Sequence, residues 1–80
     1  MKHSSIIVRA QWDEEARVWV ASSSDIGGLS VEADTIENLN QKVLAAIADL
    51  IELNGFESDL SEVPVHLLAE QLSRIPVPSH

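Results

Sequence analysis

Three groups of side chains in this sequence are of types that could do chemistry: an acidic run, a serine run and three histidines. Carboxylates that converge in space can hold two metal ions for phosphodiester cleavage. The acidic run Asp13-Glu14-Glu15 follows an apolar stretch, Ile6 to Gln11, that carries no carboxylate to meet it. A run of like charges is typical of a solvated turn. We therefore predict no nuclease centre and no catalytic residue.

The serines and histidines also lack the settings that chemistry requires. Ser22-Ser23-Ser24 has no Gly-x-Ser-x-Gly context to present a nucleophile, so these serines are interpreted as polar residues at a strand end. The histidines have no partner four residues away, and the chain contains no cysteine. We predict no metal site and no cofactor, and interpret His66 as a strand or surface residue; the others are His3 and His80.

The charge balance points to a protein partner. Thirteen acidic residues against five basic ones give a formal charge of −8, which repels nucleic-acid phosphates and anionic membranes. The basic residues are scattered singly rather than gathered into a stripe: Lys2, Arg9, Arg17, Lys42 and Arg74. We expect no direct nucleic-acid or membrane binding, and a basic protein is the better partner. The apolar run at residues 6–8 is too short for a signal peptide, so a cytoplasmic location is expected.

The length predicts one small domain. Eighty residues, of which 45% are hydrophobic and 22% charged, suit a single globular unit over residues 1–80. A core of this size is marginal, so self-association is expected from length alone. Pro76 and Pro78 stop any regular element, and residues 76–80 are expected to form a flexible tail.

A hairpin should open the chain. Ser5 to Trp12 and Arg17 to Ser23 are rich in β-branched residues, and the short polar connection between them requires antiparallel pairing. Two registers remain open: a four-residue loop places Trp19 opposite Ala10, and a bulged five-residue loop places Val20 there. The choice decides which side chains share a face of the sheet.

A turn, a strand and a helix should follow. The turn chemistry of Asp25-Ile26-Gly27-Gly28 precedes a short strand from Leu29 to Ala33. Asp34 is expected to cap the helix, with Thr35 next and Glu37 at the third helical position reaching back to the cap. The helix should end at Asn54-Gly55, and its apolar stripe comprises Leu39, Val43, Ile47, Leu50 and Ile51. From Val63 to Val77, periodicity favours a second helix slightly over a strand.

The turns between these elements and the start of the helix resemble those of the HicB-like antitoxin superfamily. The resemblance covers about two thirds of the chain: the tryptophan-acidic hairpin, the Gly-Leu turn and the helix start, at matched positions Asp25, Gly28, Asp34, Thr35 and Glu37. More narrowly, the chain looks like a small family of uncharacterised stand-alone domains related to HicB.

This resemblance implies an α+β fold of β-β-β-α-β order, similar to a reduced RNase H fold. An antiparallel meander carries one helix on one face, and Val63 to about Gln71 becomes a fourth strand beside the first, against the periodicity. That crossover is right-handed, as parallel connections require. The uncovered face would present Ile7 or Trp19, depending on register, and would favour a dimer or tetramer.

The resemblance also implies a function. A HicB-like domain would be a non-catalytic interaction module that neutralises a small basic HicA-like toxin, an mRNA-cleaving protein, by covering its active site. The chain carries no helix-turn-helix or ribbon-helix-helix segment after the domain, so DNA binding is not expected. The alternatives are a homo-oligomeric domain without a toxin and a degenerate small-ligand or RNase H-like domain.

Overall fold

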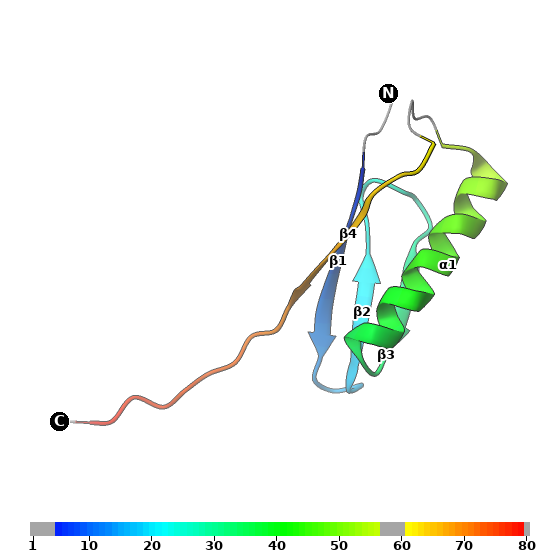
Figure 1. Cartoon of the computed structure of the whole chain (residues 1–80). Helices are drawn as coiled ribbons and strands as arrows, with labels where there is room; N and C mark the ends of the chain where they lie inside the picture. Colours follow the sequence, from blue (N-terminus) through cyan, green and yellow to red (C-terminus); the bar gives the residue numbers. More distant parts are fainter. Residues whose placement is uncertain (1–4, 57–60, 80) are drawn as a thin grey trace.

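In the part of the chain that the structure describes, four strands form one mixed sheet, and one helix lies on one face of it (Figure 1). The computed structural model describes residues 5–56 and 61–79. The sheet order is β3-β2-β1-β4, and the predicted α+β arrangement is confirmed. The elements, in chain order, are β1 (Ile6–Asp13), β2 (Val18–Ser22), β3 (Ser30–Ala33), α1 (Ile36–Asn54) and β4 (Val65–Glu70).

The last segment is a strand, so the helical periodicity was misleading. β4 pairs parallel with β1, from Ile6 beside Val65 to Gln11 beside Glu70. The Ile6 N–H donates to the carbonyl of Pro64 at 2.9 Å, which extends the contact just before the strand. A short isolated helix is marginally stable in water, whereas pairing with the central strand β1 gives this segment both hydrogen-bond partners and packing. Tertiary context therefore overrides the local pattern.

The hairpin register differs from both predicted alternatives. Ala10 pairs with Ala21, and Trp12 pairs with Trp19. Asp13 remains in β1, and its carboxylate accepts from two N–H groups of the loop, those of Glu15 and Ala16, at 3.1 Å each. The Arg17 N–H donates to the Asp13 carbonyl at 2.7 Å, and Arg17 has a φ of 60°. This capped turn occupies residues 14–17 and sets the register of the whole hairpin.

The core lies between the sheet and α1. Burial alternates along β1, where Ile6, Val8 and Ala10 are at most 1% exposed and the residues between them face away. The helix contributes the expected stripe, of which Leu39, Val43 and Ile47 are buried. The turn before β3 also contributes two buried side chains, Ile26 and Leu29. The apolar faces of one helix and one sheet therefore close on each other.

Of the two glycines in this turn, only Gly28 needs to be glycine. Gly28 has a φ of +87°, a region that favours glycine, and a Cβ there would lie 3.4 Å from Leu50 Cδ2. Gly27 does not have a positive φ, and a Cβ there would meet nothing within 4 Å. The backbone conformation at Gly28, rather than a lack of space, therefore requires the glycine.

The helix starts one residue later than the capping prediction placed it. Thr35 is the N-cap, with an extended backbone, and its Oγ1 accepts from the Asn38 N–H at 3.1 Å. Asp34 Oδ1 instead accepts from the Asn38 side-chain amide at 3.1 Å. Glu37 consequently stands at the second helical position, where its charge complements the helix dipole. The predicted Asp34–Glu37 capping box was wrong because the threonine hydroxyl takes the cap.

The helix ends where the sequence predicted. Asn54 is its last residue, and the Gly55 N–H donates to the Ile51 carbonyl at 2.8 Å. Gly55 has a φ of 79°, so the chain leaves the helix through a conformation that glycine adopts without strain.

The cap assignment makes a stability prediction. Thr35→Ala should lower the free energy of unfolding by about 1 kcal/mol, because the Asn38 N–H loses its acceptor. Thr35→Ser keeps a hydroxyl and should restore most of the loss. Asp34→Ala should cost less than Thr35→Ala, since Asp34 bonds only a side chain. Urea titrations of the three variants at one protein concentration measure these differences, and the reverse order for the two alanine variants would reassign the cap to Asp34.

Candidate functional site

The face of the sheet opposite α1 is the candidate functional site. Alternation along β1 places Ile7, Arg9 and Gln11 on this face, and Ile7 is 39% exposed. In the parallel register His66 lies beside Ile7, and Leu68, which is 47% exposed, lies beside Arg9. Ile7 was expected as an interface residue, and the alternation of β1 places it on the uncovered face, next to His66.

The second half of this face comes from the antiparallel strands. Val20 of β2 pairs with Gln11 on one side and with Glu32 of β3 on the other. Val18 and Val20 are half-buried, and the neighbouring polar residues are exposed. The face thus mixes apolar and charged side chains, as transient protein interfaces do. Its members are Ile7, Arg9, Gln11, Asp13, Val18, Val20, Ser22, Ser30, Glu32, His66, Leu68 and Glu70.

The open register allowed Trp19 to lie on this face or in the core, and the structure places it on the helix side of the sheet. Its register partner Trp12 stands on the helix-facing side of β1, and Trp19 packs against the buried core as a half-buried residue. The two indole rings meet edge to face, with centroids 5.5 Å apart and an interplanar angle of 62°. The pair closes one end of the core because the observed register turns both tryptophans towards α1.

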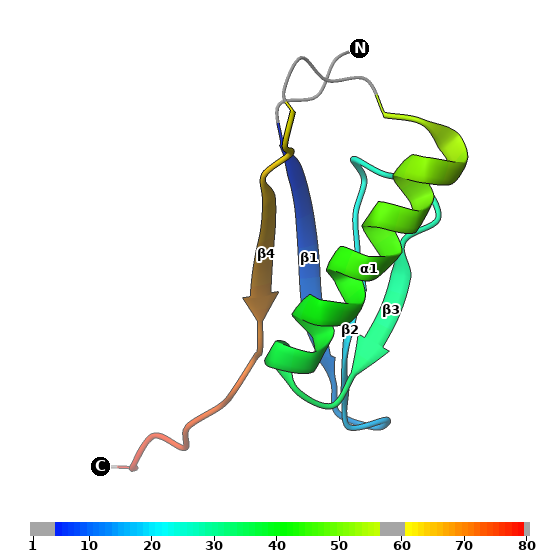
Figure 2. The same cartoon turned by 45° about the vertical axis from the view of Figure 1, so that its right-hand side comes forward.

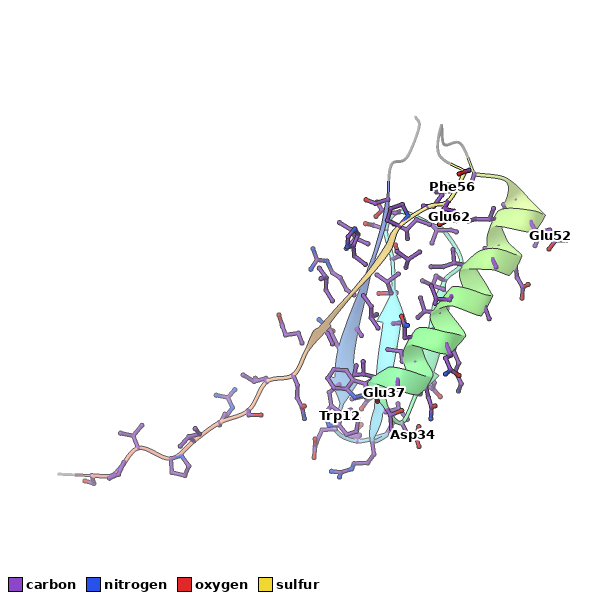
Figure 3. All side chains as sticks on the ribbon, viewed as in Figure 1. Trp12, Asp34, Glu37, Glu52, Phe56 and Glu62 are labelled. Atoms are coloured by element: carbon purple, nitrogen blue, oxygen red, sulfur yellow. The ribbon has the colours of Figure 1, made fainter. Side chains whose placement is uncertain are left out.

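The acidic run forms an exposed turn beside this tryptophan pair. Trp12 Nε1 donates to Glu14 Oε2 at 2.6 Å, and Arg17 Nη1 lies 3.0 Å from Glu14 Oε1. The Arg17 guanidinium carbon is 5.7 Å from the centroid of the Trp12 ring. Figure 3 shows Trp12 at the end of the molecule where Asp34 and Glu37 begin the helix. The local contacts therefore order the turn without converging carboxylates.

The Asp25 side chain hydrogen-bonds to the start of β1 and not to the backbone of its own turn. Its Oδ2 accepts from the Ile7 N–H at 2.8 Å, and Ser23 Oγ donates to the Ile7 carbonyl at 2.7 Å. Ser23 Oγ also accepts from the Asp25 N–H at 3.1 Å. The side chains after β2 thus satisfy the backbone of Ile7, 18 residues earlier than Asp25. Sequence reasoning missed this role because it considered only the neighbouring backbone.

The titratable residues of the described chain do not assemble into a recognisable centre. Within residues 5–56 and 61–79, no three histidine or acidic side chains are grouped so as to hold a metal ion. His66 is exposed on the uncovered face, whereas His3 and His80 lie outside the described residues. In the same part of the chain, no helix combines the length and apolar character needed to cross a bilayer.

The fold and this surface together define a small α+β domain whose sheet is covered on one side only. Residues 5–78 match the model of a domain of unknown function, DUF1902, and the chain belongs to that family. The expectation of an uncharacterised family is thereby confirmed.

The chain is also similar to the crystal structure of a hypothetical protein, TTHA1013, from the extremely thermophilic bacterium Thermus thermophilus. The two share 41% sequence identity over 91% of this chain and 99% of that chain, with a TM-score of 0.67. No curated protein matches the sequence.

Proposed function

We propose that this protein is a non-catalytic interaction module that binds another protein through its uncovered sheet face. The observation that carries the proposal is the exposure of two large apolar side chains, Ile7 and Leu68, on neighbouring strands of that face, which also holds half-buried Val18 and Val20. Apolar side chains interspersed with polar ones are the usual composition of a reversible protein contact. Such a contact is reversible, because the apolar strip is narrow and interrupted by Arg9 and Gln11.

The charge of the chain supports a basic partner. The formal charge is −8, and the uncovered face carries Glu32 and Glu70, with Arg9 as its one arginine or lysine among the described residues. Complementary potentials accelerate encounter and reject acidic competitors. A small basic protein with an apolar patch therefore suits this surface better than an acidic protein or a nucleic acid does.

The finer form of the proposal comes from the resemblance to HicB. On that resemblance, the partner is a small basic mRNA-cleaving protein of the HicA type, and binding covers its active site. The same surface would then act as an antitoxin by occlusion, which requires no chemistry from this chain. A cytoplasmic location follows from a partner that cleaves mRNA.

The test compares two substitutions that add the same charge at different places. Ile7→Lys places an ammonium on the uncovered face, and its alkyl stem can lie along the sheet as the isoleucine does. Leu53→Lys is the matched control, because Leu53 is 79% exposed on α1. Each protein, and the wild type, is captured at low salt from its own host, and whatever co-elutes is identified by mass spectrometry.

We expect a stoichiometric small basic protein with the wild type and with Leu53→Lys, and its loss with Ile7→Lys. Inhibition of that protein's RNase activity on binding would establish the antitoxin form. A partner retained equally by all three chains would place binding elsewhere than on this face. Wild-type protein that elutes only with itself would reject the proposal in favour of an orphan domain.

A further inference from the structure

The C-terminal arm, residues 71–79, is an apolar segment that does not join its own domain. It follows β4 and runs away from the sheet and helix (Figure 1). Its three large apolar side chains are almost fully exposed: Leu72 is 77%, Ile75 87% and Val77 86% accessible. Exposed apolar residues this concentrated mark a contact site rather than a tail.

The sequence of the arm also favours an extended backbone. Ile75 and Val77 each precede a proline, and a residue before proline is biased towards extended backbone. A segment that is already extended loses less conformational entropy on docking. In an extended continuation of β4, alternation puts Ile75 and Val77 on the side of Leu67 and Ala69, which is the side of the helix.

The same domain holds an apolar pocket that suits this arm. The pocket has a volume of about 460 Å³ and lies between the C-terminal half of α1 and the start of β4. It exists because α1 packs mainly over β3 and β2 and slants away from β4 (Figure 2). Its lining includes Ile47, Ile51, Phe56, Ser61, Val63 and Val65.

The chain's own arm is badly placed to fill its own pocket. The arm leaves the C-terminal end of β4, whereas the pocket lies at the N-terminal end. To reach it, the chain would have to turn back immediately after Glu70, whereas the arm runs away from the sheet and the helix (Figure 1). The arm therefore does not fill the pocket of its own copy.

Among the described residues no strand lies along the outer edge of β4, so a second copy can pair its own β4 there. β4 is the last strand in the order β3-β2-β1-β4, so one row of its backbone N–H and C=O groups has no strand partner. Two copies of such an edge pair antiparallel about a two-fold axis perpendicular to the sheet. Both helices then lie on one side, and each arm runs past the start of the other copy's β4.

The reach of the arm agrees with this arrangement. The five residues after Glu70, as far as Ile75, span about 16 Å when extended, which carries Ile75 beyond the start of the other copy's strand.

We infer that the protein forms a two-fold dimer in which β4 pairs with β4 and each arm seats Ile75 and Val77 in the apolar pocket of the other copy. This dimer uses an edge and a groove, so the uncovered face of each copy stays free for the partner proposed above. Failure of one proposal therefore does not contradict the other.

Cross-linking tests where the arm goes. The chain has no cysteine, so Ile75→Cys and Ser61→Cys can be made as two separate single-cysteine proteins and mixed. We expect a mixed disulfide between the two proteins on mild oxidation, seen as a heterodimer by mass spectrometry. Glu15→Cys mixed with Ile75→Cys is the control for random collision, because Glu15 is exposed in the hairpin turn at the other end of the sheet from the pocket. A yield no higher than in this control would overturn the inference.

Sedimentation of the full chain tests what the arm contributes. The double variant Ile75→Asp, Val77→Asp alters only exposed side chains, so circular dichroism should match the wild type. We expect a wild-type dimer and an increase of its dissociation constant by about a hundredfold or more in the variant. A wild-type monomer, or a dimer that the variant leaves unchanged, would contradict the arm exchange. Loss of a dimer by Ile7→Lys alone would assign self-association to the uncovered face instead.

Discussion

Replacing Leu39 by alanine is expected to lower the free energy of unfolding by about 2–5 kcal/mol. Leu39 is fully buried, in the first turns of α1, and belongs to the core cluster with Val8 and Val43. Truncation removes buried apolar atoms and leaves a cavity, which the surrounding side chains fill only in part. For a domain of this length the loss is a large share of a total stability of about 4–12 kcal/mol.

Leu53→Ala is the matched control for Leu39→Ala. Leu53 stands on the same helix but is 79% exposed, so its truncation should change the unfolding free energy by no more than about 0.5 kcal/mol. Urea titrations followed by circular dichroism measure both variants. They must share one protein concentration, because self-association would add to apparent stability. Equal losses in the two variants would mean that α1 does not bury the stripe described above.

Trp19→Ala should be the second most damaging change, with a loss of about 2–4 kcal/mol. Trp19 is half-buried against the core, and its edge-to-face contact with Trp12 closes the end of the sheet near the hairpin. Since both rings lie on the helix-facing side, the effect should appear in the unfolding of each copy and leave the dissociation constant of any dimer unchanged.

Trp19→Phe provides the control, because it keeps an aromatic ring in the pair and should recover more than half of the loss. Urea unfolding gives the stability of each copy, and sedimentation of the folded protein gives its association. The opposite result, a dissociated dimer with normal unfolding of each copy, would move Trp19 from the core to an interface and contradict the register of the hairpin.

The two proposals assign the uncovered face and the arm to two different kinds of contact. The face around Ile7 mixes apolar and charged groups, which suits a partner that binds reversibly. The arm and the pocket are apolar, which suits a lasting contact between copies. Because β1 is central and β4 is at the edge, a dimer formed at the edge extends the sheet and places two uncovered faces side by side.

The candidate site was only partly predictable. The expected face held Ile7, and the structure places it there, but Leu68 and Val20 were not named because no register was available to align them. Residues 76–80 were expected to form a flexible tail, since Pro76 and Pro78 end regular structure. The proposed exchange of arms depends instead on the apolar residue before each proline, Ile75 and Val77.

The sequence by itself determined the number and type of the first four elements and the end of the helix at Asn54. These features depend on chemistry within a few residues, such as β-branched runs, the turn at Gly28 and the glycine after the helix. Turn and strand preferences act on the backbone locally, so they can be read without knowing what packs against them.

Only the tertiary structure decided the hairpin register, the strand at 65–70 and the side of the sheet on which Trp19 lies. Each depends on pairing between residues far apart in the chain. A shift of one residue sends every side chain of a strand to the other face at little local cost, and only the packing of the whole face against α1 selects among such shifts. The packing of the core beneath the helix therefore determines which residues lie on the uncovered face of the sheet.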